Sequence, residues 1–140
     1  LEYRCTPFYV RMPENPDYTW DDGHFIYLAT VELGEMVGQV FAILYDNAIK
    51  YAEEGGEIVV CVSQTKKQVI CSVKNTGKGI SPQDLPHIFD RFYRADTSRS
   101  GDGYGLGLSI AQNIAHHIGG TITAKSVENE WTEFIFEFDI

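Results

Sequence analysis

Two stretches of the chain carry apolar residues at helical spacing, and a pair of glycines follows each of them. Between Gly34 and Ala52 the apolar side chains share one helix face: Val37, Val40, Phe41, Leu44 and Ala48. Between Leu106 and Ile118 the corresponding stripe contains Leu108, Ala111, Ala115 and Ile118. Gly55-Gly56 and Gly119-Gly120 are expected to end the two helices, because glycine readily terminates a helix. Two such helices need a common apolar surface against which both can pack.

Segments with strand patterns lie before, between and after the two predicted helices. A sheet formed by them would provide the apolar surface on which the helices pack. They are His24 to Glu32, Glu57 to Gln64, Gln68 to Lys74, Thr121 to Val127 and Glu133 to Asp139. Residues 1–23 form an irregular segment, in which Phe8 to Met12 could add an edge strand. Ser81-Pro82 begins a third helix, which Pro86 keeps short. The pattern predicts an α+β fold, a two-layer sandwich with helices on one face of a sheet.

Length and charge restrict the function. The 140 residues favour one domain, residues 1–140. Twenty acidic and eleven basic residues give a net charge of −9, which argues against binding long nucleic acids. Basic residues outnumber acidic ones only in the middle, 50–99, where a small anion such as a nucleotide phosphate could bind. An ordinary solvated surface explains the same distribution.

Membrane and cysteine signals are weak. No apolar run is long enough to span a bilayer, and no signal peptide opens the chain. Cys5, Cys61 and Cys71 lack the spacing of a metal site, so reduced thiols in a cytosol are expected.

An asparagine inside the first predicted helix is the first residue that suggests chemistry. Asn47 lies where asparagine is disfavoured, and Lys50 and Tyr51 follow about one turn later. An amide oxygen suits Mg²⁺, a lysine suits phosphate, and a tyrosine ring can pack on a base. A solvent-facing amide would explain Asn47 equally well.

Two glycine-rich segments could approach a ligand closely. In Asn75 to Ile80, directly after a predicted strand, Gly77 and Gly79 are one residue apart. Gly101 to Leu108 opens the second helix, whose N-terminal N–H groups can bind an anion. Each segment alone also fits an ordinary glycine-rich turn.

Between the glycine segments, Ile88 to Asp96 alternates aromatic and basic residues. Arg91, Arg94 or Arg99 could reach a phosphate. Alternatively, the aromatic side chains hold the loop to the core while the arginines pair with Asp90 or Asp96.

In this order, the four segments resemble the N, G1, F and G2 boxes of the ATP-binding catalytic domain of sensor histidine kinases. The resemblance extends from Val31 to Phe138, and its most specific motifs are Ile88 to Asp96 and Gly103 to Leu108. These kinases share a superfamily with gyrase, Hsp90 and MutL. The resemblance implies a Bergerat-type fold, with a mixed, mostly antiparallel sheet, three helices on one face and an ATP lid at residues 81–104.

The resemblance also implies the cofactors ATP and Mg²⁺ and a set of ATP-binding residues. These are Asn47, Lys50, Tyr51, Asn75, Gly77, Gly79, Ile80, Phe92, Arg94, Gly103, Tyr104, Gly105, Leu106 and Gly107. Within this set, Asn47 would chelate Mg²⁺, Lys50 would lie near phosphate and Tyr51 beside the adenine. Ile80 would contact the base, and Arg94 could meet the phosphates. Phe89 belongs to the F box as well.

Two residues depart from the family pattern. Asn75 stands where the G1 box usually has an aspartate that reads the adenine amino group. Ile43 stands four residues before Asn47, where kinases usually have another asparagine and gyrase-type ATPases a glutamate that activates water. Isoleucine can neither activate water nor bind a metal.

The implied function is transfer of the γ-phosphoryl group of Mg·ATP to a histidine on a separate dimerisation domain. His24, His87, His116 and His117 all lack the context of that acceptor histidine, so the chain looks like a catalytic domain excised from a longer receptor. Its expected partners are that dimerisation domain and a response regulator, with no nucleic acid. We expect a cytoplasmic domain of a membrane-anchored kinase, without membrane contact of its own.

Two alternatives remain open from the sequence. Asn75 and Ile43 could mark a degenerate nucleotide-binding or interaction module without turnover. A gyrase- or MutL-type ATPase is the other alternative, and Ile43 and the kinase-like F box argue against it.

Overall fold

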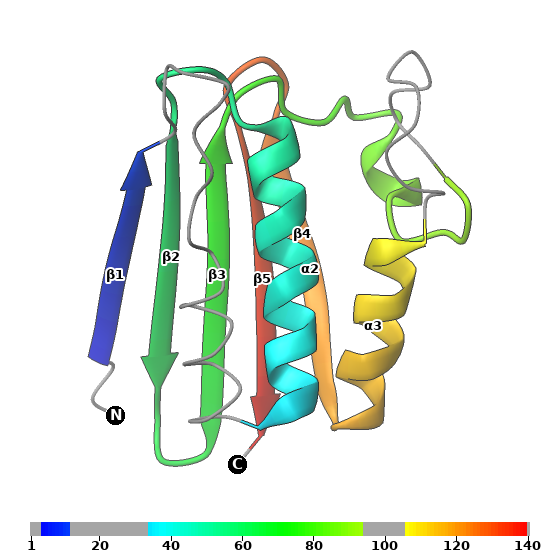
Figure 1. Ribbon diagram of the computed structural model, residues 1–140. Helices are drawn as coiled ribbons and strands as arrows, with labels where there is room; N and C mark the ends of the chain where they lie inside the picture. The colour runs from blue at the N-terminus through cyan, green and yellow to red at the C-terminus, as the bar shows by residue number, and fades with distance from the viewer. Residues whose placement is uncertain (1–3, 12–33, 94–105, 140) are drawn as a thin grey trace.

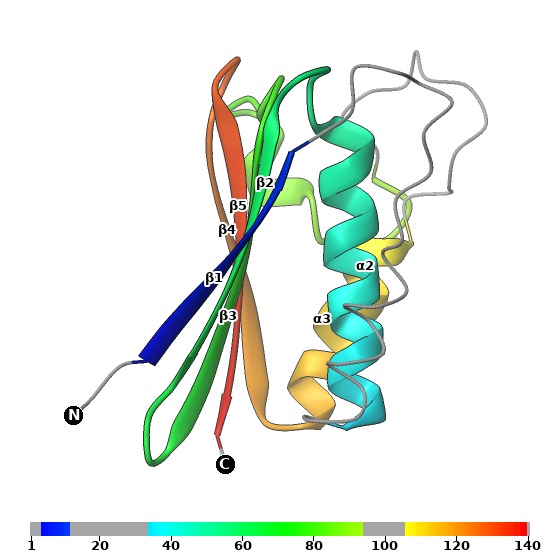
Figure 2. The same cartoon turned by 60° about the vertical axis from the view of Figure 1, so that its left-hand side comes forward.

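The computed structural model describes residues 4–11, 34–93 and 106–139, whose strands form a single sheet (Figure 1). In chain order, the elements are β1 (Arg4–Arg11), α2 (Glu35–Tyr51), β2 (Glu57–Gln64), β3 (Gln68–Thr76), the 3₁₀ turn η1 (Leu85–His87), α3 (Gly107–His117), β4 (Gly120–Val127) and β5 (Trp131–Asp139). The five strands lie in the order β1-β2-β3-β5-β4, and the described neighbours are all antiparallel. Both α-helices cover the same face of the sheet (Figure 2), which confirms the predicted α+β two-layer sandwich.

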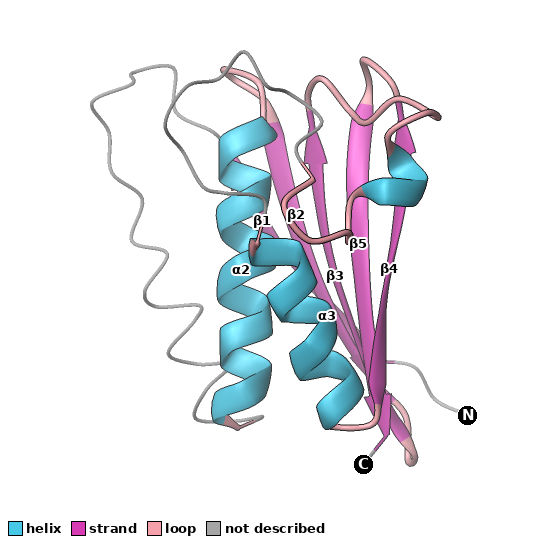
Figure 3. Cartoon of the chain, turned by 90° about the vertical axis from the view of Figure 1, so that its right-hand side faces the viewer, coloured by secondary structure: helices cyan, strands magenta, loops and turns pink. Residues whose placement is uncertain are grey.

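The predicted apolar stripes are the surfaces by which the helices pack. The α2 stripe is buried throughout, from Val37 to Ala48. On α3, Ala111 and Ala115 are fully buried, and Leu108 and Ile118 of the same stripe are half-buried against the core. Figure 3 shows the helices side by side over the sheet.

Buried and half-buried side chains alternate along β3 and β5, and the buried ones supply the other half of the core. Phe134, Phe136 and Phe138 of β5 face the helices, and Phe136 stacks on Phe138 at 5.2 Å between ring centroids. Cys71 of β3 lies on the same inner face, where burial raises the pKa of its thiol to about 12. The thiol is therefore protonated at neutral pH and acts as a small apolar core group.

Three expectations about the elements need comment. The expected edge strand at Phe8 to Met12 is β1, which covers Arg4–Arg11, so part of the segment 1–23 is regular. The third helix from Ser81 is only the 3₁₀ turn η1, since Pro86 interrupts the helical hydrogen bonds. The predicted strand from His24 to Glu32 lies outside the described residues.

The cysteines depart from expectation. Cys61 on β2 is disulfide-bonded, whereas Cys71 is free, so the prediction of reduced thiols is wrong for Cys61. Spacing could not reveal this, because a disulfide depends on which segments the fold brings together. In the part of the chain that the structure describes, no helix is both long and apolar enough to cross a membrane.

Candidate functional site

The C-terminal half of α2 meets the beginning of α3. A Cβ atom on Gly107, the first residue of α3, would lie 3.6 Å from the Cγ2 atom of Ile43. Asn47 follows Ile43 by four residues and therefore shares its helix face. Asn47 is half-buried, and its side chain makes no hydrogen bond within the described residues. The amide is thus available to a ligand beside the α3 N-terminus.

Among the described residues, no side chain caps the N-terminus of α3. Leu106 occupies the cap position, and the first turn has no acidic residue. The Ser109 hydroxyl donates back to the Leu106 carbonyl oxygen at 2.8 Å, so it does not cap the free N–H groups. Such N–H groups carry partial positive charge and can bind an anion. Lys50, one turn beyond Asn47, pairs with Asp46 at 3.2 Å, and the two side chains are 39% and 64% exposed.

The segment after β3 is attached to the end of α2. Ala52 and Gly77 form an isolated β-bridge, and the Glu53 N–H donates to the Thr76 carbonyl oxygen at 3.2 Å. Gly77 has a φ of 153°, and a Cβ atom there would lie 2.3 Å from the Tyr51 carbonyl oxygen. The close approach of two backbones therefore requires glycine at position 77, whether or not a ligand is bound.

We expect Gly77→Ala to lower the free energy of unfolding by about 3 kcal/mol, because the added methyl group would overlap the α2 backbone. Gly119→Ala is the matched control. Its φ of 79° is also positive, but no atom lies within 4 Å of the added Cβ, so only the backbone cost of about 1 kcal/mol applies. Urea unfolding of both variants measures the difference. Equal losses would contradict the close approach.

Asn75 lies at the end of β3 on the inner face of the sheet, with 2% of its surface exposed. Its Nδ2 atom donates to the Thr76 carbonyl oxygen at 3.2 Å. Within the described residues, its Oδ1 atom accepts no hydrogen bond. A buried amide oxygen without a donor costs free energy, so this position favours a ligand that can donate one.

Gly79 and Ile80 continue the segment across the end of the sheet. Gly79 has a φ of 69°, and a Cβ atom there would lie 2.5 Å from the Val127 carbonyl oxygen. Ile80 is half-buried and packs against the hydrophobic core. The G1 segment thus lies between the end of α2 on one side and the β4–β5 hairpin on the other.

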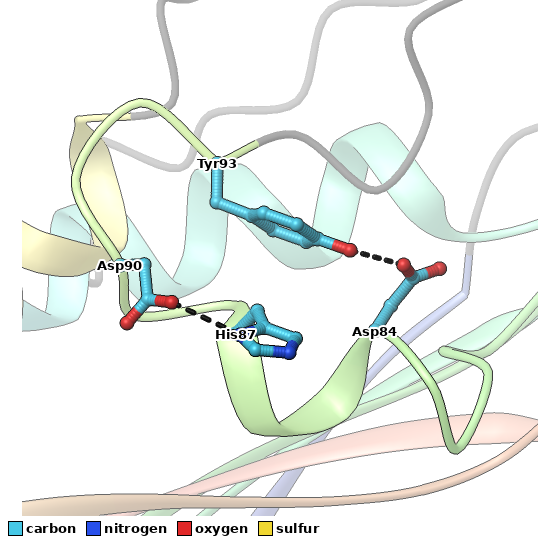
Figure 4. Close-up of polar contacts among 4 residues, drawn as sticks. All are labelled: Asp84, His87, Asp90 and Tyr93. Atoms are coloured by element: carbon cyan, nitrogen blue, oxygen red, sulfur yellow. Dashed lines mark hydrogen bonds and ion pairs between the residues drawn. The ribbon is translucent and has the colours of Figure 1, made fainter.

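The following segment, residues 81–93, is folded back on itself (Figure 4). The Ser81 hydroxyl caps the turn by accepting from the Asp84 N–H at 3.2 Å and donating to the Asp84 carboxylate at 2.8 Å. The Tyr93 hydroxyl donates to the other oxygen of the same carboxylate. His87 lies 3.1 Å from the Asp90 carboxylate and against the Tyr93 ring. Asp84 and Tyr93 therefore join the two ends of the segment.

This bond shifts the pKa values of both partners. Hydrogen bonds from Tyr93 and Ser81 lower the pKa of Asp84, and the bond to Asp84 raises the pKa of Tyr93. The Asp84 contribution is present above the ordinary aspartate pKa and disappears as pH falls through the lowered value. The Tyr93 contribution is present below the ordinary tyrosine pKa and disappears as pH rises through the raised value. The hydrogen bond between the neutral Tyr93 hydroxyl and the ionised Asp84 carboxylate therefore contributes fully between about pH 4 and pH 10.

Tyr93→Phe should speed amide hydrogen exchange in residues 85–92 up to about tenfold at neutral pH, because one hydrogen bond that closes the segment is lost. Mass spectrometry of the corresponding peptide measures the rate. The difference from the wild type should shrink as Asp84 becomes protonated, and α3 serves as an internal control. A difference that persists unchanged below the pKa of Asp84 would mean that the Tyr93 hydroxyl acts through a partner other than the Asp84 carboxylate.

The two F-box phenylalanines lie in opposite environments. Phe89 packs edge-to-face on Phe134 of the core, with ring centroids 6.3 Å apart. Phe92 is 66% exposed and has a φ of 66°, an uncommon backbone conformation outside glycine. Asp90 pairs with His87 rather than with an arginine. Phe89 is thus held to the core, as one of the two interpretations of this segment expects. Asp96, Arg94 and Arg99 lie outside the described residues, so the expected pairing of the arginines stays a prediction.

The remaining predicted residues fall into two groups. Leu106 and Gly107 lie at the start of α3, beside the face that carries Asn47. Arg94, Gly103, Tyr104 and Gly105 lie outside the described residues. The described residues contain no group of three or more His, Cys, Asp or Glu side chains that could hold a metal ion. Asn47, the metal ligand that the family resemblance implies, lies in this part of the chain and is half-buried.

Sequence reasoning missed the polar contacts that hold the site together. Tyr93 follows Asp84 by nine residues, a spacing with no helical or strand periodicity to suggest a contact. Ser126 and Thr132 come from the β4–β5 hairpin, far along the chain from the G1 segment. A buried threonine opposite Asn75 could have been found only once the strand register was known.

Comparison with known proteins identifies the family. The family model described as "Histidine kinase-, DNA gyrase B-, and HSP90-like ATPase" matches residues 33–140. The sensor protein CiaH of Streptococcus pneumoniae is 44% identical over 107 residues, which are 75% of this chain and 24% of CiaH. The sensor protein SrrB of Staphylococcus aureus is 38% identical over 105 residues, 74% of this chain and 18% of SrrB. The chain thus spans a quarter or less of these relatives.

Solved structures agree. The mycobacterial sensor histidine kinase MprB aligns with a TM-score of 0.67 and 26% identity, covering 76% of this chain and 73% of that one. The catalytic domain of histidine kinase ThkA aligns with a TM-score of 0.66 and 25% identity, covering 97% and 95%. Full-length ShkA, solved with AMPPNP, aligns with a TM-score of 0.63 and 30% identity, covering 74% and 21%. The chain therefore belongs to the family of histidine kinase-, DNA gyrase B- and HSP90-like ATPases.

Proposed function

We propose that the chain is the ATP-binding catalytic domain of a sensor histidine kinase. It binds Mg·ATP, and a histidine nitrogen on a separate dimerisation domain takes the γ-phosphoryl group while ADP leaves. The observation that carries the proposal is the half-buried amide of Asn47, without a described side-chain partner, beside the uncapped N-terminus of α3. The relatives of this chain, CiaH and SrrB, are named sensor proteins, which supports the kinase function.

At the base end, Asn75 accepts a hydrogen bond from the adenine amino group through its Oδ1 atom. Ile80 and Tyr51 contact the base, and the G1 segment with Gly77 and Gly79 forms the backbone around it. This arrangement is supported by the burial of Asn75 and by the orientation of its amide, whose Nδ2 atom already donates to Thr76. Tyr51 is 40% exposed, so part of its ring is accessible to a ligand.

At the phosphate end, Asn47 supplies the protein oxygen that holds Mg²⁺. One amide oxygen fits this ion, because Mg²⁺ usually keeps several waters and takes further ligands from substrate phosphates. When bound, Mg²⁺ neutralises the phosphate charge. Lys50 and the N–H groups of Leu106 and Gly107 hold the phosphates. Arg94, Gly103 and Tyr104 complete the ATP lid, residues 81–104, and Gly105 follows it at the turn into α3.

The domain acts by positioning and by charge neutralisation. The acceptor histidine is itself the nucleophile, so this domain needs none. The partners are the dimerisation domain of the full-length receptor and a response regulator, and the receptor is anchored in a membrane with this domain in the cytoplasm.

A non-enzymatic nucleotide-binding module is the second candidate. It is favoured by Ile43, which packs against the core and provides no metal ligand where kinases usually have an asparagine. The same residue argues against a gyrase-type ATPase, because no carboxylate is available at that position to activate water.

Calorimetry followed by a phosphorylation assay separates these functions. The domain is titrated with Mg·ATP and with a non-hydrolysable analogue, and then incubated with the longer receptor and labelled ATP. Binding of both nucleotides and label on a receptor histidine are expected. Failure to bind either nucleotide would refute the proposal, binding without transfer would identify a non-enzymatic module, and phosphate release without an acceptor would identify an ATPase.

A further inference from the structure

The hydroxyl group of Ser126 on β4 is a junction between three segments. It donates to the Trp131 carbonyl oxygen at 2.7 Å and accepts from the Ile80 N–H at 2.7 Å. A third contact joins it to the Thr132 hydroxyl at 3.1 Å. Because a serine hydroxyl has a single proton, which goes to Trp131, Thr132 must be the donor in this contact. The hydrogen-bonding capacity of Ser126 is therefore fully used.

The G1 segment has little freedom beside this junction. A Cβ atom on Gly79 would lie 3.1 Å from the Ser126 Oγ atom. The Asn129 N–H donates to the Lys78 carbonyl oxygen at 2.6 Å, from a residue with a φ of 65°. In Figure 1, the β4–β5 hairpin lies beside the segment that follows β3. The hairpin thus fixes the path of the backbone from Lys78 to Ile80.

The junction also connects to Asn75 across the sheet. The strand registers place Asn75 opposite Thr132 and Thr132 opposite Ser126. Asn75 and Thr132 are 2% and 4% exposed, so this polar row is largely sealed from solvent. The row ends at the Ile80 N–H, which Ser126 holds. The Ser126 hydroxyl therefore holds both Ile80 and Thr132, the residue opposite Asn75.

We propose that Ser126 is a positioning residue for the base end of the nucleotide site. It touches no nucleotide; it holds Ile80 and Thr132 so that Ile80 and Asn75 meet the base together. This inference rests on the proposed function, since it requires that the domain binds ATP. Ser126→Ala would leave the Ile80 N–H, the Trp131 carbonyl and the Thr132 hydroxyl without their partner.

The test is calorimetry of the full chain at a temperature at which every variant is folded. Ser126→Ala should bind ATP, ADP and adenosine each about three- to tenfold more weakly, because Ile80 and Asn75 are no longer held in place; a loss of this size equals the net contribution of about one hydrogen bond to the base. The loss should be the same with and without Mg²⁺, because the phosphate end is unchanged. Ser126→Thr retains the hydroxyl and should restore most of the affinity. Ser72→Ala makes the same change on the opposite face of the sheet and should bind like the wild type.

The outcomes separate two failures. Wild-type protein that binds no ATP would overturn the proposed function. If the wild type binds ATP and Ser126→Ala binds all three ligands as tightly as the wild type does, Ser126 only stabilises the fold. A loss confined to Mg·ATP would place its effect at the phosphate end and also overturn the inference. If Ser126→Ala does not fold, Ser126→Cys, which fills the volume but hydrogen-bonds weakly, should show the same uniform loss.

Discussion

Asn47→Ala is expected to weaken binding of Mg·ATP on the order of a hundredfold and to leave metal-free ATP binding nearly unchanged. Loss of partners that merely orient metal ligands already costs ten- to a hundredfold, and a directly coordinating oxygen should cost at least as much. The effect should be this large because Ile43, one turn earlier, cannot substitute as a ligand. Calorimetry with and without Mg²⁺ measures both affinities.

Asn113→Ala provides the matched control, since Asn113 is an exposed asparagine on α3 and does not share the helix face that carries Asn47. Both variants should be slightly more stable than the wild type, by roughly 0.5 kcal/mol, because alanine is the better helix former. If Asn47→Ala leaves both ATP affinities unchanged, Asn47 is a simple surface amide. If it lowers them equally with and without Mg²⁺, Asn47 does not act through the metal.

The two long helices, α2 and α3, could be predicted in detail because their apolar stripes carry the information. Every residue of the Val37 to Ala48 stripe is buried, and α3 begins one residue after the predicted Leu106. The order of the strands could not be predicted, because it depends on contacts between residues far apart in the sequence. β5 lies between β3 and β4, although it is the last strand of the chain.

The candidate site divides in the same way. Local segments could be found from their residue types, and their clustering followed only from the family resemblance. The structure adds a physical reason for Gly77 that needs no ligand, namely the Tyr51 carbonyl oxygen beside it. It also adds Ser126, whose role depends on the pairing of β4 with β5 and is invisible in the hairpin sequence itself.

The burial of Asn75 sharpens the expected nucleobase preference. Adenine presents an amino donor, which the Asn75 Oδ1 atom can accept, whereas guanine presents a carbonyl acceptor at the same place. To donate to guanine, the amide must turn over and give up the Nδ2 bond to Thr76, at a cost of about 1 kcal/mol. The wild type should therefore prefer ATP over GTP only about tenfold.

Asn75→Asp should raise this ATP-to-GTP ratio by roughly two orders of magnitude. A carboxylate accepts from the adenine amino group with about twice the strength of a neutral acceptor and repels the guanine carbonyl. Because position 75 is 2% exposed, an unpaired carboxylate there should also destabilise the nucleotide-free domain. ATP should then raise the melting temperature of Asn75→Asp more than that of the wild type. Competition binding of ATP against GTP measures the ratio.

Asn113→Asp adds the same charge on the exposed surface of α3 and should leave the ratio and the melting temperatures nearly unchanged. This control separates recognition at position 75 from a general effect of one more negative charge on a protein of net charge −9. A wild type that already prefers ATP a thousandfold would contradict the role of Asn75, because a neutral amide held by one weak bond to Thr76 cannot reject guanine so strongly. A ratio that stays constant in Asn75→Asp would mean that another group reads the base.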